Sequence, residues 1–343
     1  MKPFLEVKNL FVSFPTEDGV VRASDDITFS VSRGETLAVV GESGSGKSVT
    51  SLAVMGLHNR KKTNISGQAI LNLPTGPVDT ISAPAETVRK LRGKSMAMIF
   101  QDPMSALHPY YTIGNQITEA WGLYNDGSKA EGIKRAVELL DLVGIPSASK
   151  RVDDYPHQFS GGMRQRVMIA MALVNNPSLL IADEPTTALD VTIQSQILQL
   201  LRDMQKEFNM AVILITHDLG VVAEVADRVC VMYAGKIVEQ AKIDDVYYGP
   251  DHPYTIGLLN SIPRVDRGGD QRLQAIPGQP PSLISLPPGC SFKPRCAHSK
   301  MVPNNRCATE IPNLDEKSVA HFSRCHLTDS QLAQVRTSAG GQS

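Results

Sequence analysis

Gly41-Glu42-Ser43-Gly44-Ser45-Gly46-Lys47-Ser48 is the stretch that decides how this chain of 343 residues folds. It fits the pattern G-x-x-x-x-G-K-[ST], in which a glycine-rich backbone holds phosphate groups. The apolar run 37–40 before it is typical of a strand, and residues 49–55 after it can continue as a helix. A strand, a glycine turn and a helix start together direct several backbone N–H groups at a polyphosphate. A flexible surface turn is the alternative, and the strand and helix context argues against it.

The side chains of this stretch have separate expected roles. Glycines allow the backbone to approach a ligand closely, because a Cβ atom would block both the turn and the ligand. Lys47 supplies a positive charge for the β- and γ-phosphates, and the hydroxyl of Ser48 is a Mg²⁺ ligand. Phe14 precedes the loop on a predicted strand and is a candidate for stacking on a purine. An ordinary half-buried strand aromatic explains Phe14 equally well.

Composition and charge exclude several classes of protein. A hydrophobic content of 42% and a charged content of 20% are those of an ordinary globular protein. The net charge of −1 gives no general nucleic-acid footprint. Residues 1–8 lack the apolar core of a secretion signal, and runs such as 167–174 are far shorter than the ~18–20 residues of a membrane span. We therefore expect a cytoplasmic protein that reaches a membrane only through a partner.

Polar residues follow several apolar strands at the point where each one ends. The run 97–100 ends at Gln101-Asp102-Pro103, the run 179–182 ends at Asp183-Glu184, and the run 211–216 ends at His217. If these strands lie in one parallel sheet with the strand before Gly41, their polar ends meet where open α/β sheets bind ligands. Gln101 would reach Mg²⁺ or the attacking water, or would simply be a polar residue at a strand end. The pattern predicts a nucleotide hydrolase site.

A mainly helical region without strand signals, from Thr112 to about Asn175, separates the run 97–100 from the run 179–182. Apolar residues recur at helical spacing after Ser160-Gly161-Gly162, so that these residues lie at a helix N-terminus suited to an anion. An ordinary serine cap with a glycine turn is the alternative. Asp190 precedes another amphipathic helix and is a good N-cap in either case.

These motifs together resemble the ATP-binding cassette family over residues ~1–260. The resemblance implies an α/β fold, with a P-loop nucleotide-binding domain at 1–235 that contains a helical signature subdomain at about 103–177. A small cysteine-containing extension would occupy 236–343, with its four-cysteine segment at 289–326 and a disordered tail over 338–343. It further implies that ATP contacts residues along the loop and the aromatic before it: Phe14, Gly41, Ser43, Gly44, Ser45, Gly46, Lys47, Ser48 and Val49.

The same resemblance assigns the remaining site residues. Glu184, His217 and Gln101 would be catalytic, and Ser48, Gln101 and Asp183 would hold Mg²⁺. Asp190 belongs to the D-loop, in Ala188-Leu189-Asp190. Ser160, Gly161, Gly162 and Met163 match the signature that binds ATP of a second cassette, although Phe159 and Met163 replace the Leu and Gln of its commonest form.

A closer likeness is to the ATP-binding subunits of importers for oligopeptides, dipeptides, nickel and opines. It depends on the segments Phe100 to Met104, Tyr155 to Gln158, Ser160 to Ala172, Asp183 to Asp190, His252-Pro253-Tyr254 and the tail 289–296. His108 stands where such subunits usually carry Asn. The likeness implies import of oligopeptides or dipeptides, a head-to-tail dimer with a paralogous ATP-binding subunit, two membrane permease subunits and, indirectly, an extracytoplasmic substrate-binding protein. The chain would then lie at the cytoplasmic face of the cell membrane, with no nucleic-acid partner.

Other functions are open at this point. An importer of nickel, opines or another small solute would carry the same motifs. A soluble cassette ATPase of translation or repair is a different class, but here a single cassette has neither a second copy nor long heptad insertions. An exporter cassette fits poorly with the proline- and cysteine-rich tail.

Four of the five cysteines fall near the end of the chain, at Cys290, Cys296, Cys307 and Cys325. Their spacing lacks the C-x₂-C pair of small zinc modules, so that spacing alone is a weak signal. Four thiolates suit a [4Fe–4S] cluster, and related peptide-importer subunits resemble this chain in carrying one. Zinc, with His298, His321 or His326, and four buried free thiols are the alternatives. Cys230 is expected in a core strand.

Overall fold

The computed structural model describes residues 2–102, 106–187, 189–262 and 275–340. Pro103 and Met104, which belong to the expected strand end, and Ala188 of the expected D-loop lie outside these residues. The chain divides into two compact units, the first made of residues 1–5, 30–36 and 71–215 and the second of 6–29, 37–70 and 216–343. Each unit is described by itself. Among the described residues, no helix has the length and apolar character needed to cross a membrane.

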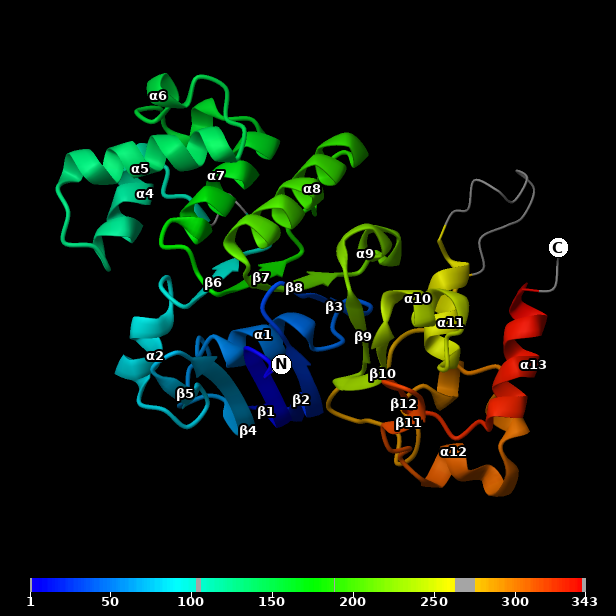
Figure 1. Cartoon of the computed structure of the whole chain (residues 1–343). Coiled ribbons are helices and arrows are strands. Elements are labelled where there is room, and N and C mark those ends of the chain that lie inside the picture. The colour runs from blue at the N-terminus through cyan, green and yellow to red at the C-terminus, as the bar shows by residue number, and fades with distance from the viewer. Residues whose placement is uncertain (1, 103–105, 188, 263–274, 341–343) are drawn as a thin grey trace. The chain divides into compact units, whose positions relative to one another are not determined.

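Three parallel strands form the centre of the first unit (Figure 1). They are β6 (Met96–Ile99), β7 (Leu179–Asp183) and β8 (Ala211–Thr216), with Met96 opposite Leu179 and Leu179 opposite Ala211. Every residue of the three strands is buried, as expected for parallel strands covered on both faces. Their carboxyl ends therefore share one edge, which is where Gln101 and Glu184 follow.

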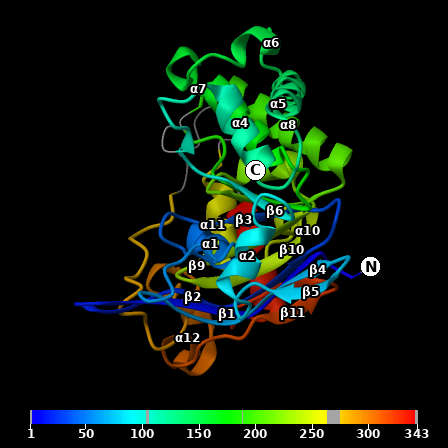
Figure 2. The same ribbon diagram turned by 90° about the vertical axis from the view of Figure 1, so that its left-hand side faces the viewer.

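Helices make up most of the rest of this unit, as the absence of strand signals after residue 112 predicts. Figure 2 shows α4, α5, α6 and α7 grouped together. Helix α5 begins with a capping box, in which Ser128 and Glu131 bond to each other's backbone N–H groups. The elements of the unit besides β6, β7 and β8 are β5 (Gly76–Asp79), α2 (Ala85–Leu91), α4 (Ile113–Gly122), α5 (Lys129–Leu142), α6 (Ala148–Arg151), η1 (Pro156–Gln158), α7 (Gly161–Leu173) and α8 (Val191–Phe208).

The second unit contains the phosphate-loop strand. Strand β3 (Thr36–Val40) pairs in parallel with β9 (Arg228–Tyr233), and β9 pairs antiparallel with β10 (Lys236–Lys242). Cys230 lies on β9 and is fully buried, as expected. The unit also contains β1 (Leu5–Thr16), β2 (Gly19–Val31), α1 (Lys47–Val54) and β4 (Asn64–Leu73).

The extension after residue 235 continues this sheet. Strand β10 pairs with β12 (His321–Ser323), and β12 pairs with β11 (Asp315–Ser318). The sequence pattern misses β10 because the buried Lys236, Glu239 and Gln240 interrupt its apolar run. The other elements of the unit are α9 (Leu219–Val225), α10 (Ile243–Tyr248), α11 (Pro253–Asn260), η2 (Lys293–Arg295), η3 (Ser299–Met301), η4 (Pro303–Asn305), α12 (Arg306–Thr309) and α13 (Asp329–Gly340).

Two expectations for the tail have different outcomes. Residues 277–288, which carry five prolines (Pro277, Pro280, Pro281, Pro287 and Pro288), contain no helix or strand, as the proline-rich composition of the tail predicts. Helix α13 continues through Gly340, and residues 341–343 of the expected disordered tail lie outside the described residues.

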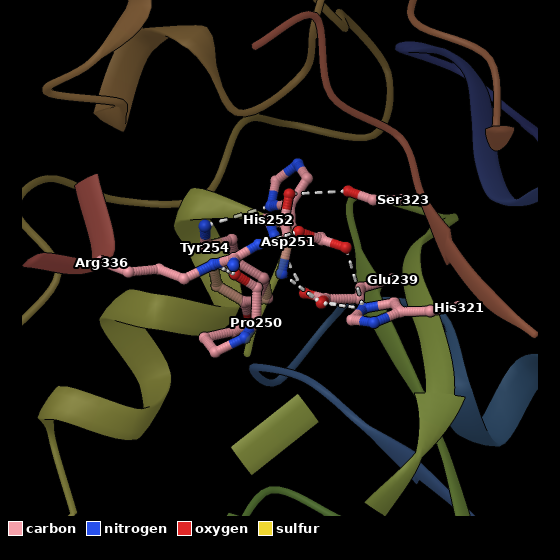
Figure 3. A network of polar contacts seen from close by, with 8 residues as sticks. All are labelled: Glu239, Pro250, Asp251, His252, Tyr254, His321, Ser323 and Arg336. Carbon is pink, nitrogen blue, oxygen red and sulfur yellow. Dashed lines mark hydrogen bonds and ion pairs between the residues drawn. The ribbon is translucent and has the colours of Figure 1, made fainter. Parts of the chain in front are cut away.

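A buried polar network holds the start of α11 against β10 (Figure 3). The Glu239 carboxylate, fully buried, accepts the N–H groups of Asp251 at 2.5 Å and His252 at 3.1 Å and bonds His321 Nε2 at 2.7 Å. Burial opposes charge on His321, but the hydrogen bond and charge of Glu239 outweigh it and raise its pKa. Burial lowers the pKa of His252 to about 3, and its neutral Nδ1 accepts the Tyr254 N–H at 3.0 Å. The network therefore fixes the direction in which the Tyr254 side chain projects from α11.

Candidate functional site

The phosphate loop lies between β3 and α1, as the sequence predicts. Lys47 is the first residue of α1 and is 5% exposed. Its Nζ donates to the carbonyl oxygen of Gly41 at 2.7 Å and to that of Glu42 at 3.1 Å. The backbone of the loop therefore surrounds the Lys47 side chain. The ammonium group lies within the turn, where it would contact a bound phosphate.

Two glycines of the loop are required by close backbone contacts. A Cβ atom on Gly41 would lie 2.2 Å from the carbonyl oxygen of Met232. A Cβ atom on Gly46, whose φ is +101°, would lie 2.0 Å from the carbonyl oxygen of Ala23. The Ser45 hydroxyl is buried and has no hydrogen-bond partner among the described residues. A buried hydroxyl left open in this turn suits an anionic ligand that accepts its hydrogen.

The strand end of β7 carries the expected hydrolytic residues in the first unit. Asp183 ends the strand and is 6% exposed. Glu184 has a φ of +45°, a strained backbone for a residue with a Cβ atom, and such strain concentrates at functional sites. Its carboxylate accepts the Gln101 Nε2–H at 2.9 Å and the Thr187 hydroxyl at 2.8 Å. The sequence did not single out Thr187, whose hydroxyl orients the carboxylate.

The signature residues form the N-terminus of α7. Ser160 is exposed, and its hydroxyl accepts the Met163 N–H at 3.4 Å. A Cβ atom on Gly161 would meet nothing within 4 Å, so its backbone is open to a ligand. Asp190 caps α8 by accepting the Ile193 N–H at 3.0 Å. Both the cap and the anion-site explanations of Ser160 are compatible with this geometry.

The two units divide the candidate site residues between them. Gln101, Asp183, Glu184, Asp190 and the signature belong to the first unit, and the structure brings Gln101 and Glu184 into direct contact. The phosphate loop through Val49, together with Phe14 and His217, belongs to the second. The Phe14 ring meets the His58 ring edge-on, with 5.5 Å between centroids. His217 follows the last residue of β8 directly.

All four cysteines of the tail line one small apolar cavity in the second unit. The cavity measures about 10 Å³, room for about one water molecule. Burial raises the pKa of each thiol, to about 11 for Cys296 and about 12 for Cys325. None of these four cysteines forms a disulfide bond. In the described parts of the chain, no group of three or more His, Cys, Asp or Glu side chains is arranged to hold a metal ion.

The histidines near the cysteines separate into two sets. His298 and His326 line the same cavity, whereas His321 does not and bonds Glu239 instead. The four thiols could therefore act as ligands of a metal ion or an iron–sulfur cluster. They must move apart before a cluster of several atoms enters, because the cavity has room for about one water molecule. The sequence could not show this convergence, because the cysteines come from separate loops and the start of α12.

Comparison with known proteins identifies the family of this chain. A family model described as ABC transporter matches residues 24–187, and one described as the C-terminal region of oligopeptide/dipeptide transporters matches residues 238–301. The oligopeptide transport ATP-binding protein OppD of Salmonella typhimurium is 53% identical over 306 residues, with 88% of each chain covered. OppD of Escherichia coli is 50% identical over 321 residues, covering 94% of this chain and 92% of its own.

Solved structures give the same result for the fold. The ATP-binding cassette MJ0796, solved as a dimer in a post-hydrolysis state bound to ADP and Pi, is 27% identical with a TM-score of 0.61. The similarity covers 70% of this chain and 98% of that one. The structure of cbiO1 from Clostridium perfringens, part of an ABC transporter complex, is 29% identical with a TM-score of 0.61 and covers 75% of this chain and 96% of its own. The chain belongs to the ABC transporter family, in its branch of oligopeptide transport ATP-binding proteins.

Proposed function

We propose that this chain is the ATP-hydrolysing subunit that energises import of oligopeptides or dipeptides through an ABC transporter. The observation that carries the hydrolytic part is the Gln101–Glu184 hydrogen bond, which places an amide and a carboxylate together at the carboxyl edge of parallel strands. The peptide part is supported by OppD relatives about half identical over most of the chain, including its extension.

The phosphate loop would bind the nucleotide. Its backbone N–H groups and Lys47 Nζ would replace water around the β- and γ-phosphates. Ser48 and Asp183, with Gln101, would hold Mg²⁺, since hydroxyl, carboxylate and amide oxygens are the ligands that this ion prefers. When bound, the ion neutralises charge on the phosphates. Phe14 would lie against the purine.

Glu184 would accept a proton from the attacking water as general base. In the described structure its carboxylate is occupied by Gln101 and Thr187. Both groups donate to the same oxygen, Oε2. We therefore propose that Gln101 turns from Glu184 towards the nucleotide when ATP binds, which removes one of the two hydrogen bonds to Oε2 and leaves this oxygen better able to accept a proton from the water. His217 would contact the γ-phosphate and help to position that water.

Hydrolysis would take place in a head-to-tail pair of cassettes. Ser160 to Met163 would then bind the γ-phosphate of the partner's ATP, and the open backbone at Gly161 and the exposed Ser160 support this role. We propose a paralogous ATP-binding subunit as the second cassette, two membrane permease subunits that hold the pair at the cytoplasmic face of the membrane, and a substrate-binding protein outside the cell.

Transport is tested by uptake of a labelled tripeptide in cells of the source organism. Cells that carry Glu184→Gln in place of the natural chain are expected to lose uptake, and the natural gene should restore it. Glu207→Gln, which changes an exposed carboxylate of α8, is the matched control and should transport normally. Unchanged uptake, with the Glu184→Gln protein present in the cells, would exclude peptide and move the assignment to nickel, opines or another solute.

We further propose that Cys290, Cys296, Cys307 and Cys325 hold a [4Fe–4S] cluster. Four thiolates are the usual ligands of such a cluster, and the convergence of all four thiols on one cavity supports the proposal. The thiols would lose their protons and separate as the cluster enters. The apolar lining would then shield the cluster from solvent.

Protein purified without oxygen is therefore expected to contain iron and acid-labile sulfide, on the order of four of each per chain. Cys296→Ser should lose most of both. Cys230→Ser, at the buried cysteine of β9, is the control and should keep them. Stoichiometric zinc in place of iron would favour the zinc alternative, and protein without either metal would leave four free thiols.

A further inference from the structure

An arginine of the cysteine-bearing segment reaches the phosphate loop. Arg295 ends η2, next to Cys296, and its two terminal nitrogens donate to the two carboxylate oxygens of Glu42 at 2.7 Å and 3.0 Å. Glu42 is the second residue of the loop. The paired geometry is the strong form of an arginine–carboxylate contact, and the Arg295 side chain is only 5% exposed.

Arg295 is itself held in place by neighbouring groups. Its Nε donates to the carbonyl oxygen of Pro277 at 2.9 Å. Its guanidinium also lies 5.7 Å from the centre of the Tyr233 ring, within the range of a cation–π contact. The guanidinium therefore has one preferred position, opposite the Glu42 carboxylate.

The backbone of Glu42 is fixed as well. Its N–H donates to the Tyr254 hydroxyl at 3.0 Å, and its carbonyl oxygen accepts Lys47 Nζ at 3.1 Å. Tyr254 is fully buried at the start of α11, beside the network that Figure 3 shows. Its ring packs on Phe292, with 5.4 Å between centroids. The extension thus holds both the side chain and the N–H group of one phosphate-loop residue.

If Arg295 only attached the extension to the phosphate loop, any hydrogen-bond acceptor of the loop could serve as its partner. Here the partner is a carboxylate in a turn whose N–H groups and lysine would face the phosphates of the nucleotide. An unpaired carboxylate in this place would repel the phosphates, and the repulsion between charges a few ångströms apart is substantial where water is partly excluded. Arg295 cancels that charge.

We propose that Arg295 is a positioning residue for nucleotide binding, which neutralises Glu42 and holds the phosphate loop from the cysteine-bearing segment 290–296. The inference rests on the proposed ATP-hydrolysing function. Nucleotide affinity then depends on how this segment is folded, even though none of its residues belongs to the loop.

Binding of ADP to the purified full-length chain tests the proposal. Arg295→Gln is expected to raise the Kd for ADP about tenfold, a size typical of coupled sites. The KM for ATP should rise by a similar factor with little change in kcat. Adding Glu42→Gln to Arg295→Gln should recover most of the affinity, because the uncompensated charge is removed. Glu42→Gln alone, which leaves the arginine facing the phosphates, should lower the Kd.

Arg324→Gln is the matched control. Arg324 also ties the extension to a carboxylate, that of Asp26 at 3.3 Å, but it makes no contact with the phosphate loop among the described residues. Its loss should lower the melting temperature and leave the Kd of the folded protein unchanged. Arg295→Gln protein that is folded and binds ADP like the natural chain would overturn the inference, as would a double variant no better than the single one. If Arg295→Gln does not fold, a higher Kd for Glu42→Gln alone would overturn it. Failure of the natural chain itself to bind ADP would instead contradict the proposed function.

Discussion

Replacing Glu184 by Gln is expected to slow ATP hydrolysis by about 10²- to 10⁴-fold, the usual contribution of a positioned general base. The amide cannot take a proton from water, yet it has nearly the same shape and can still accept a hydrogen bond. Gln101 and Thr187 hold the side chain by donating to one carboxylate oxygen, Oε2, and an amide oxygen in the same position can accept both hydrogen bonds. ATP binding should therefore be retained.

The measurement is single-turnover hydrolysis of ATP by purified protein, together with ATP affinity at equilibrium. Glu207→Gln provides the control, because it removes an exposed carboxylate of the same unit at the C-terminal end of α8, the end opposite its Asp190 cap. A Glu184→Gln protein that hydrolyses ATP within a few-fold of the natural rate would refute the general-base role. Loss of ATP binding in the same variant would instead assign Glu184 to the binding site.

The site elements were predictable because their signals are local. A glycine-rich loop between an apolar run and a helix, and polar residues at Gln101 and Asp183-Glu184 after apolar runs, correspond to real strand ends in the structure. The N-caps at Ser160 and Asp190 were equally predictable, since a cap depends on a few neighbouring residues. In each case the residues that form the feature are consecutive.

The extension could not be predicted in the same way. Strand β10 is stabilised by Glu239, whose buried carboxylate is matched by groups from residues 251, 252 and 321. The Arg295–Glu42 pair joins residues 253 positions apart. The periodicity of a sequence does not indicate a contact that depends on tertiary folding. A charged residue that will be buried cannot be told from an exposed one by sequence alone, because its partner is distant in the chain. Such long-range polar pairs are where sequence patterns carry least information.

Replacing Gly46 by Ala is expected to cause the second large effect, a loss of nucleotide binding that results from backbone geometry alone. In Gly46→Ala the new methyl group would lie 2.0 Å from the carbonyl oxygen of Ala23, so the loop must move. The backbone φ of +101° adds strain of about 1–3 kcal/mol for a residue with a Cβ atom. A displaced loop misaligns N–H groups whose hydrogen bonds to a charged ligand are each worth about 1.5–3 kcal/mol. Two such bonds lost would weaken ADP binding by at least about 100-fold.

Gly76→Ala is the control that separates the effect of the close contact with Ala23 from the effect of backbone strain. Gly76 has a similar φ of +119°, but a Cβ atom there would meet nothing within 4 Å, and the residue lies outside the phosphate loop. Thermal unfolding and ADP affinity of both variants are the measurements. Gly76→Ala should lose stability and keep its affinity, whereas Gly46→Ala should lose both. If the two variants bind ADP equally well, the close contact with Ala23 does not determine the shape of the loop, and the phosphates would have to be held mainly by Lys47.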